Sequence, residues 1–389
     1  MKILITTDWY HPVINGVVTS VLNLETQLRR LGHEVRILTL AENMHSRKEG
    51  DVYYVRSCSA GKIYPNARVA ISVKSPYVEE MIRWKPDVIH SQCEFTSFPF
   101  AKRIARETKA PILHTYHTVY EDYTHYFSPN LVVGKQLAEW FTRRIAGRVD
   151  AMIAPTEKVR ELLSRYGIQK PIYTIGSGIE IERFSKRTPE PELENLRRAY
   201  GITEGQTVLV TVGRLAKEKN IEEILYGLAA REQRGFLYLL VGDGPHRPSL
   251  EALVRELGLS GQVRFTGMIE PEQVPAHYQL GDLFVSASSS ETQGLTYLEA
   301  LASGLPALCR RDDCLRGIIY EEGNGMLYHN QEELARKLEV LLGDPALRRQ
   351  LGGAAIRSVQ PWSVEQFGAQ IEAVYRVLAG NTQDLVKAG

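Results

Sequence analysis

Two carboxylates, Glu291 and Glu299, lie eight positions apart on either side of a glycine-containing entry into a helix. A glycine-containing turn that leads into a helix N-terminus offers backbone N–H groups and the positive end of the helix dipole to an anion. Eight residues span about two helical turns, so the two acids can face different parts of one ligand. The spacing therefore predicts a phosphate site flanked by two acids, which suits a nucleotide-sugar because hydroxyl groups lie on both sides of its diphosphate.

Two cations follow an earlier apolar run and Gly213. Arg214 can bind two phosphate oxygens at once, and Lys219, near the start of the next helix, supplies a point charge. Cations in loops are usually solvated, but a position just beyond a buried strand favours anion binding. A metal ion would then be dispensable.

Glycines also occur in the loops that follow other predicted strands. Gly16, between the first strand and the first helix, would let the backbone approach a diphosphate, or it serves the turn alone. Gly242 and Gly244 form a weaker G-x-G pattern, and no G-x-G-x-x-G fingerprint of nicotinamide binding is present. Met268 and Ile269 follow another strand and are candidates for binding a base, with core packing as the alternative.

The segment 113–127 is rich in histidine and tyrosine. His117, Glu121 and His125 have a spacing of four, but the H-E-x-x-H arrangement of zinc sites is not met and no fourth ligand is indicated. We favour His117 as a hydrogen-bonding partner of a ligand hydroxyl at a strand end. An aromatic stripe at helical spacing is typical of a core, or else of an acceptor surface; it comprises Tyr116, Tyr120, Tyr123 and Phe127.

The segment 135–148 places aromatic side chains among basic ones. Trp140 and Phe141 stand beside Arg143 and Arg144. A basic amphipathic helix with aromatic residues can lie in a membrane interface. An ordinary packed helix with one solvated face is the alternative.

Composition is that of a soluble globular protein of two domains, because 389 residues exceed one ordinary core. The net charge of +1 argues against a dedicated nucleic-acid binder, although residues 1–180 carry 24 Lys and Arg against 18 Asp and Glu. No apolar run of about 18 residues and no targeting segment is visible. The four cysteines lack paired-ligand spacing, which predicts free buried thiols and a reducing cytoplasm.

Apolar runs alternate with amphipathic helices such as 17–31 and 364–378, which is a βαβ pattern. Expected strands are 2–6, 34–40, 52–55, 88–90, 112–116, 151–154 and 172–175, then 207–212, 237–241, 263–266, 283–286 and 307–309. We expect an α/β protein with two Rossmann-like, doubly wound domains facing across a cleft, with ligands beyond the carboxyl ends of the strands. The domains would be 1–182 with the helix at about 364–380, and 205–363, joined by a charged, proline-containing linker over 183–204.

Taken in order, these motifs resemble the retaining glycosyltransferases of the GT-B fold, specifically glycosyltransferase family 4. They are Gly16, His117, Gly213-Arg214 with Lys219, Gly242-Asp-Gly-Pro245 and Glu291-x7-Glu299. Residues 114–123 and 290–299 are similar to bacterial 1,2-diacylglycerol 3-glucosyltransferases, which are peripheral membrane enzymes that use UDP-glucose. Gln293-Gly294 departs from the Phe-Gly of many family members, and the loop 90–95 lacks the glycines often found there.

The resemblance implies a role for each matching residue. Gly16, Arg214 and Lys219 would hold the diphosphate, assisted by the N–H groups of Gly294, Leu295 and Thr296; Glu299 would bind the ribose, Glu291 the sugar near its 3-hydroxyl, and His117 the 6-hydroxyl side. In the front-face mechanism proposed for retaining members, a diphosphate oxygen accepts the acceptor proton, so no side-chain nucleophile is required. Double displacement through Glu291 remains open.

We therefore expect a metal-independent retaining enzyme without a cofactor that moves glucose from a UDP-sugar to 1,2-diacylglycerol. It would be cytoplasmic and peripheral at the inner face of the cell membrane, bound to anionic lipid through its N-terminal domain. The alternatives are a family 4 enzyme with a soluble small-molecule or polysaccharide acceptor and a non-catalytic nucleotide-binding module.

Overall fold

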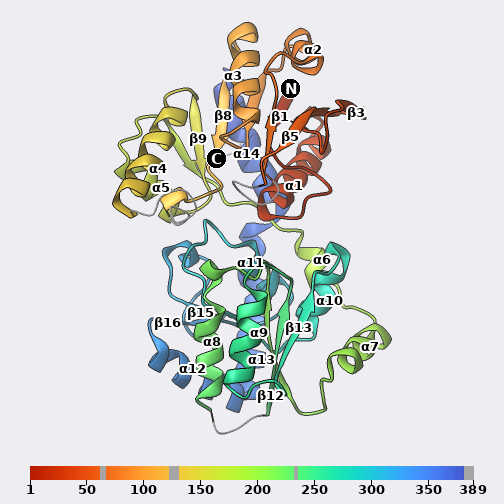
Figure 1. The fold of residues 1–389 in the computed structure, drawn as a ribbon, viewed down its shortest axis with the longest axis vertical. Helices are drawn as coiled ribbons and strands as arrows, with labels where there is room; N and C mark the ends of the chain where they lie inside the picture. Colours follow the sequence, from red (N-terminus) through yellow and green to blue (C-terminus); the bar gives the residue numbers. More distant parts are fainter. Residues whose placement is uncertain (62–66, 122–130, 232–234, 381–389) are drawn as a thin grey trace. The chain divides into compact units, whose positions relative to one another are not determined.

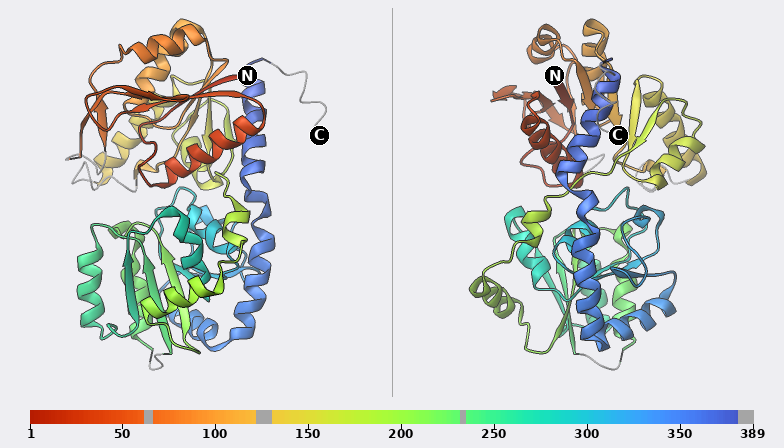
Figure 2. Two further views of the ribbon diagram at one scale, coloured as in Figure 1. Left: turned by 90° about the vertical axis from the view of Figure 1, so that its right-hand side faces the viewer. Right: turned by 180° about the vertical axis from the view of Figure 1, so that it is seen from behind.

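The computed structural model describes residues 1–61, 67–121, 131–231 and 235–380. The chain forms two compact units, one of Met1–Gly178 with Val364–Gly389 and one of Ile179–Ser363. Each unit is built on a largely parallel sheet with helices on both faces (Figure 1, Figure 2). The predicted α/β class with two Rossmann-like domains is confirmed.

The sheet of unit 1 has the order β10-β9-β8-β7-β1-β2-β4-β3, parallel except for the β3 and β4 pair. Its strands are β1 (Lys2–Thr6), β2 (Glu34–Leu40), β3 (Arg47–Glu49), β4 (Val52–Val55), β7 (Val88–Ser91), β8 (Ile112–Thr115), β9 (Ala151–Ala154) and β10 (Ile172–Thr174), and β5 (Ser57–Ser59) and β6 (Arg68–Ala70) form a separate hairpin. Its helices are α1 (Gly16–Arg30), α2 (Pro76–Trp84), α3 (Ser97–Thr108), α4 (Leu131–Ala146), α5 (Glu157–Arg165) and α14 (Val364–Leu378).

Both faces of this sheet are buried, which explains the continuous apolar strands. In β1, Ile3 and Ile5 belong to the cluster beneath α1 and α14, and Leu4 belongs to the cluster covered by α2, α3 and α5. α1 starts where the Asn15 side chain accepts the N–H of Val18 at 2.9 Å, as an N-cap does.

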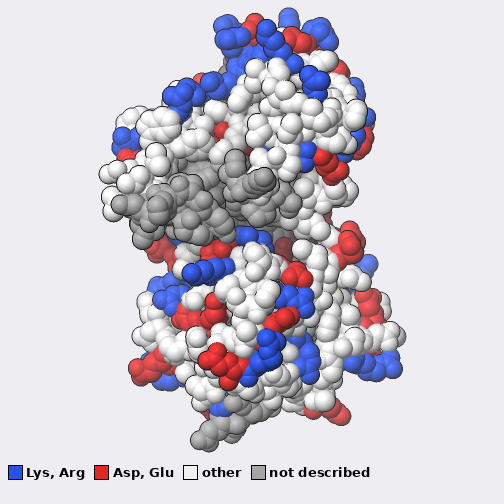
Figure 3. Space-filling view, viewed as in Figure 1, with Lys and Arg blue, Asp and Glu red and all other residues white. Residues whose placement is uncertain are grey.

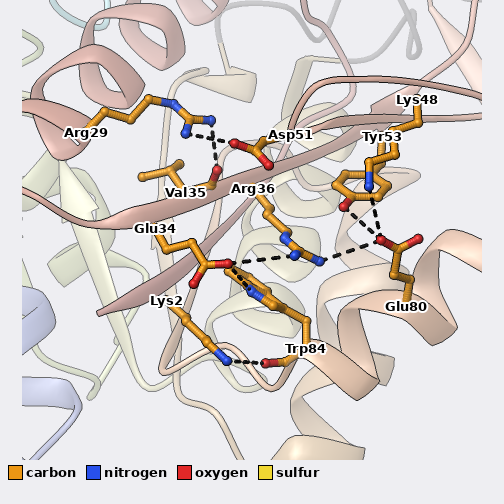
Figure 4. A network of polar contacts seen from close by, with 10 residues as sticks. All are labelled: Lys2, Arg29, Glu34, Val35, Arg36, Lys48, Asp51, Tyr53, Glu80 and Trp84. Atoms are coloured by element: carbon orange, nitrogen blue, oxygen red, sulfur yellow. Dashed lines mark hydrogen bonds and ion pairs between the residues drawn. The ribbon is translucent and has the colours of Figure 1, made fainter.

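Near β2 and β4 the sheet is fastened to α2 by a polar network around Arg36 (Figure 4). The Arg36 guanidinium lies 4.5 Å from the Trp84 ring centroid and 3.7 Å from both Glu34 and Glu80. Glu80 accepts the Tyr53 hydroxyl at 2.9 Å, so α2 is tied to β2 and β4 together.

The sheet of unit 2 has the order β13-β12-β11-β14-β15-β16 and is parallel throughout. Its strands are β11 (Thr207–Val212), β12 (Phe236–Val241), β13 (Val263–Gly267), β14 (Leu283–Ser286), β15 (Ala307–Arg310) and β16 (Gly325–Tyr328). Its helices are α6 (Ile181–Ser185), α7 (Glu190–Tyr200), α8 (Ile221–Ala229), α9 (Arg247–Glu256), α10 (Val274–Gln279), α11 (Leu295–Ala302), α12 (Gln331–Gly343) and α13 (Pro345–Ser358), with short 3-10 turns at Lys217–Lys219, Pro271–Gln273, Asp313–Leu315 and Gln360–Trp362. Chain order reverses between β11 and β14, the position where doubly wound sheets bind ligands.

The segment 183–204, which was expected to be a linker, is instead part of a folded unit. This segment lies in unit 2 and contributes to α6 and α7, with Phe184 and Leu193 in the core of that unit. These two helices were not predicted from the sequence because charged residues and prolines dominate the segment. Each helix has only one buried side chain, Phe184 in α6 and Leu193 in α7.

Three smaller differences concern thiols and strands. Cys58 is exposed, whereas the other three cysteines are buried as expected, and all four are free thiols. The edge strands β3 and β16 and the hairpin of β5 and β6 were not predicted, since short edge strands carry little apolar pattern. No helix in the described part of the chain is long and apolar enough to cross a membrane.

Candidate functional site

The carboxyl ends of β11 and β14 border a small cavity of about 20 Å³. Gly213, Arg214, Lys219, Glu291 and Thr296 are among its lining residues. The motifs that the sequence predicted for phosphate binding in unit 2 are thus gathered at the switch point of the sheet.

The loop after β11 is held by the loop after β12. The Leu215 N–H donates to the Asp243 carbonyl at 3.0 Å, and the Gly213 N–H donates to Val241 at 2.9 Å. Gly242 has φ +128°, and a Cβ there would lie 2.2 Å from the Gly213 carbonyl oxygen. A Cβ on Gly244 would likewise meet Leu215 backbone, so both glycines are required by contact between loops, irrespective of any ligand.

Both predicted cations are oriented by acids. Arg214 Nη2 donates to Glu218 Oε1 four positions on. Lys219 Nζ donates to Glu291 Oε1, which joins the loop after β11 to the loop after β14. The ammonium and the carboxylate are 29% and 16% exposed, so both remain within reach of a ligand. Ser288 Oγ also donates to Glu291 at 2.9 Å.

The helix entry between the two acids is built on Gly294. This residue is the N-cap of α11 with φ +74°, and a Cβ there would lie 2.3 Å from the Tyr297 ring. Because glycine has no side chain to cap the helix, the N–H groups of Leu295 and Thr296 at its start are not used by an N-cap side chain. This geometry fits the predicted anion site.

Glu299 lies in a different environment from Glu291. Its Oε2 accepts the Tyr278 hydroxyl of α10 at 2.9 Å. Burial raises the pKa of Glu299, and the Tyr278 hydrogen bond opposes that shift. The two acids are therefore held separately, one by a cation in a loop and the other by a tyrosine against the core.

The candidate base-binding pair splits into two roles. Met268 is 68% exposed beyond β13, whereas Ile269 packs against the core of unit 2. Met268 is thus the more exposed side chain of the two, and Ile269 is half-buried.

In unit 1, His117 follows β8 and interacts with Gln92, which follows β7. His117 Nε2 and Gln92 Oε1 are 2.7 Å apart. Burial lowers the pKa of His117 to about 4, and this effect outweighs the opposing influence of Glu94. A neutral imidazole at neutral pH is a hydrogen-bonding group rather than a cation.

A buried acid lies beside this pair. Glu94 accepts the Tyr120 hydroxyl at 2.6 Å and His114 Nε2 at 3.2 Å. Asp8, after β1, is buried and accepts the Ser97 N–H at 2.6 Å, and burial raises its pKa to about 6. These side chains surround the carboxyl ends of β1, β7 and β8, the point where the strand order of unit 1 reverses.

Gly16 is the first residue of α1, and no atom lies within 4 Å of an added Cβ. Its φ is not in the left-handed region. The local fold therefore does not require glycine at this position, in contrast to Gly294.

Helix α4 presents apolar side chains outward. Trp140 is 58% exposed with Arg144 5.5 Å from its ring centroid, and Val132, Val133 and Leu137 are also exposed. Phe141 is half-buried and stacks on Phe95 at 5.6 Å, and Phe95 itself is 51% exposed. Arg143 is paired with Glu139 at 2.7 Å.

Tyr123, His125 and Phe127 lie outside the described residues. Tyr116 is buried, and Tyr120 packs edge-on against it with ring centroids 5.8 Å apart. Glu121 accepts the Tyr166 hydroxyl at 2.6 Å. Within the described part of the chain no group of three His, Cys, Asp or Glu side chains is arranged to hold a metal ion.

Sequence reasoning overlooked some of the site. Gln92, Glu94 and Phe95 were not singled out, although they directly follow a buried strand, which is the available signal. Three further side chains hold the predicted residues Arg214, Glu291 and Glu299, namely Glu218, Ser288 and Tyr278 respectively. No sequence pattern marks these three, because each contact depends on a loop geometry or on residues that are distant along the chain.

Comparison with known families covers nearly the whole chain. Residues 14–183 match the family model "Glycosyltransferase Family 4", and residues 193–358 match "Glycosyl transferases group 1". The two matches correspond to units 1 and 2.

Two curated relatives have the same name. The alpha-monoglucosyldiacylglycerol synthase of Streptococcus pneumoniae is 35% identical over 100% of this chain and 89% of the relative. That of Acholeplasma laidlawii is 32% identical over 96% of each chain. Among solved structures, Anabaena HepE in complex with UDP-glucose is 17% identical with a TM-score of 0.76, covering 97% of this chain and 100% of that one. Sucrose-phosphate synthase from Thermosynechococcus elongatus is 20% identical with a TM-score of 0.76, covering 98% and 100%.

The likeness to the solved structures shows the fold, and the sequence identity to the two curated relatives shows membership of their family. The chain is a GT-B glycosyltransferase and belongs to glycosyltransferase family 4.

Proposed function

We propose that this protein transfers glucose from UDP-glucose to 1,2-diacylglycerol with retention of anomeric configuration and without a metal ion. The observation that carries the proposal is the Lys219 and Glu291 pair beside the N-terminus of α11, within a chain 35% identical to a monoglucosyldiacylglycerol synthase. The pair joins the cation that we propose binds phosphate to the acid that we propose binds the sugar.

Unit 2 would be the donor domain. A departing nucleoside diphosphate gathers negative charge, and preorganised cations and N–H dipoles stabilise that charge. Arg214 and Lys219 supply the cations, and the N–H groups of Gly294, Leu295 and Thr296 supply the dipoles. Gly213, Gly242 and Gly244 shape this loop array, and Met268 and Ile269 are proposed to border the base.

Each acid would bind a different part of the donor. Glu291, beside Lys219, is proposed to accept hydrogen bonds from the sugar hydroxyls near position 3. Glu299, one helical turn into α11, is proposed to bind the ribose. Their separate partners, Lys219 and Tyr278, support separate duties.

Unit 1 would be the acceptor domain. Gly16 is proposed to let its backbone approach the diphosphate, because glycine at this position has no role in the local fold. His117, neutral and bonded to Gln92, is proposed to bind the 6-hydroxyl side of the sugar. Glu94 holds Tyr120 close by, so the acceptor would meet aromatic side chains at this edge of the sheet.

The reaction would be a front-face displacement. The bond between the anomeric carbon and the diphosphate oxygen breaks, and the acceptor oxygen bonds to the same face of that carbon. The acceptor proton passes to a diphosphate oxygen, and UDP leaves. Glu291 would position the sugar rather than attack it, because Lys219 and Ser288 already engage its carboxylate.

A lipid acceptor and a peripheral position at the inner face of the membrane are supported by α4. Val133, Leu137 and Trp140 form an exposed apolar face beside Arg143 and Arg144. Such a face can enter the interface of an anionic bilayer while its arginines contact headgroups.

The test is transfer by purified protein to dioleoylglycerol in vesicles, with UDP-glucose, UDP-galactose and GDP-mannose compared. We expect UDP-glucose to be the best donor and the product to be the α-anomer by NMR, with undiminished activity in EDTA. An inverted product would rule out retention. Transfer only to a water-soluble acceptor would replace diacylglycerol as the substrate.

A further inference from the structure

Unit 1 has an open concavity of its own, at the opposite edge of its sheet from His117. It has a volume of about 570 Å³ and lies where β8 and β9 begin. Basic side chains line it, namely Lys102, Arg106, Lys109 and Arg148, together with Asp150 and the apolar residues Ala105, Ala110, Pro111, Ile112 and Leu378. Figure 3 shows Lys and Arg side chains gathered over the end of α3 at the top of the view.

Acidic groups do not balance these cations. Asp150 is the single carboxylate in the lining, and its Oδ2 accepts the Ile112 N–H at 2.8 Å. Arg106 is paired with Glu107 at the surface. Within the described part of the chain, no ion pair or side-chain hydrogen bond is found for Lys102, Lys109 or Arg148.

Structural roles account for only part of this charge. Arg106 and Lys109 lie at the C-terminal end of α3, where cations complement the helix dipole. Lys102 lies before the last turn, and Arg148 lies beyond α4, so the dipole of α3 explains neither. Burial lowers the pKa of Lys102, and the like charges of Arg148 and Arg144 lower it further.

We propose that this concavity binds a phosphate group. Lysine ammonium groups supply point charges and the Arg148 guanidinium can bind two phosphate oxygens, while the apolar residues of the lining suit the carbon skeleton attached to a phosphate ester. The residues of this pocket belong to unit 1, whereas the loops proposed to bind the donor belong to unit 2.

Two sources could deliver this phosphate, a phospholipid headgroup or a soluble phosphate. Arg144 connects the pocket to the exposed face of α4, since it both influences Lys102 and covers Trp140. A headgroup in the pocket would therefore be adjacent to the apolar face of α4. The proposal does not depend on glucosyl transfer, because binding alone defines it.

The test compares the full-length protein with Lys102→Gln/Arg148→Gln. The matched control is Arg56→Gln/Lys74→Gln, which removes the same two charges from exposed positions of unit 1. Circular dichroism and thermal unfolding establish that all three proteins are folded. One arm follows the ³¹P NMR line width of inorganic phosphate, and the other follows sedimentation with phosphatidylcholine vesicles with and without phosphatidylglycerol.

We expect the parent and the control to broaden the phosphate line and the pocket variant not to do so. On phosphatidylglycerol vesicles the pocket variant should bind at least about tenfold more weakly, since each basic side chain at an anionic surface contributes about fivefold. If the pocket variant loses both phosphate binding and vesicle binding, the site binds a lipid headgroup. If it loses phosphate binding alone, the site binds a soluble phosphate. Equal behaviour of the pocket variant and the control in both arms would overturn the proposal.

Discussion

Lys219 Nζ donates a hydrogen bond to Glu291 Oε1 across 72 positions of sequence. The contact fixes two loops of unit 2 to each other at the point where the strand order reverses. It also places a cation suited to phosphate next to an acid suited to sugar hydroxyls. Replacing either residue should therefore disturb both halves of donor binding.

Lys219→Ala should reduce glucosyl transfer by roughly 100-fold or more, because a preorganised charge on the leaving diphosphate is lost. Steady-state kinetics with UDP-glucose measure the effect. Lys217→Ala is the matched control, since Lys217 lies in the same 3-10 turn and is exposed. Equal losses in the two variants would exclude a specific role for Lys219.

Two glycine substitutions should separate binding from folding. Gly16→Ala should leave the free energy of unfolding unchanged or slightly raised, because the added Cβ meets no atom within 4 Å, and it should raise KM for UDP-glucose. Gly294→Ala should lower the free energy of unfolding by about 1 kcal/mol or more, because of φ +74° and contact with Tyr297. Urea denaturation and donor titration provide the measurements. An unchanged KM in Gly16→Ala would argue against close approach of the diphosphate there.

His117 should make stability depend on pH. Burial lowers its pKa from 6.5 to about 4, so between these values the unfolded chain binds more protons than the folded chain. The contribution of His117 to the free energy of unfolding is fully present above pH 6.5 and is lost as the pH falls toward 4. His117→Gln, which cannot titrate, should lose less stability over this window. Urea midpoints of parent and variant that fall in parallel would contradict the shift.

Asp8 should act with the opposite sign. Burial raises its pKa from 3.8 to about 6, so the folded chain binds more protons between these values. Its contribution is present below pH 3.8 and is lost as the pH rises through 6. The free energy of unfolding of Asp8→Asn should therefore rise relative to that of the parent as the pH increases across this window. The same urea titrations measure this difference.

Trp140→Ser should weaken binding to anionic vesicles by about tenfold or more, since burying a large apolar side chain in the interface is worth about 1.5–3 kcal/mol. Thermal stability should change little because Trp140 is 58% exposed. Tyr226→Ser in unit 2 is the control, with a side chain that is 50% exposed. Unchanged vesicle sedimentation of Trp140→Ser would remove α4 from the proposed membrane contact.

The fold was largely predictable, because strands buried on both faces are continuous apolar runs and the intervening helices repeat at 3.6 residues. β1, β2, β4, β9, β11, β14 and α14 have the predicted bounds. The segment 183–204 was misinterpreted, since α6 and α7 each bury a single apolar side chain among charged residues.

The sequence by itself determined the chemistry-bearing residue types of the loops that we propose bind the donor, from Arg214 to Glu299, because glycine, cations and acids at strand ends form a local pattern. Only the tertiary structure decided their partners. Lys219 meets Glu291, and Tyr278 meets Glu299, through contacts between separate loops and helices that no local spacing encodes. Likewise, only the packing of loops showed that Gly242 serves the fold while Gly16 does not, since space around a backbone atom depends on residues distant in the chain.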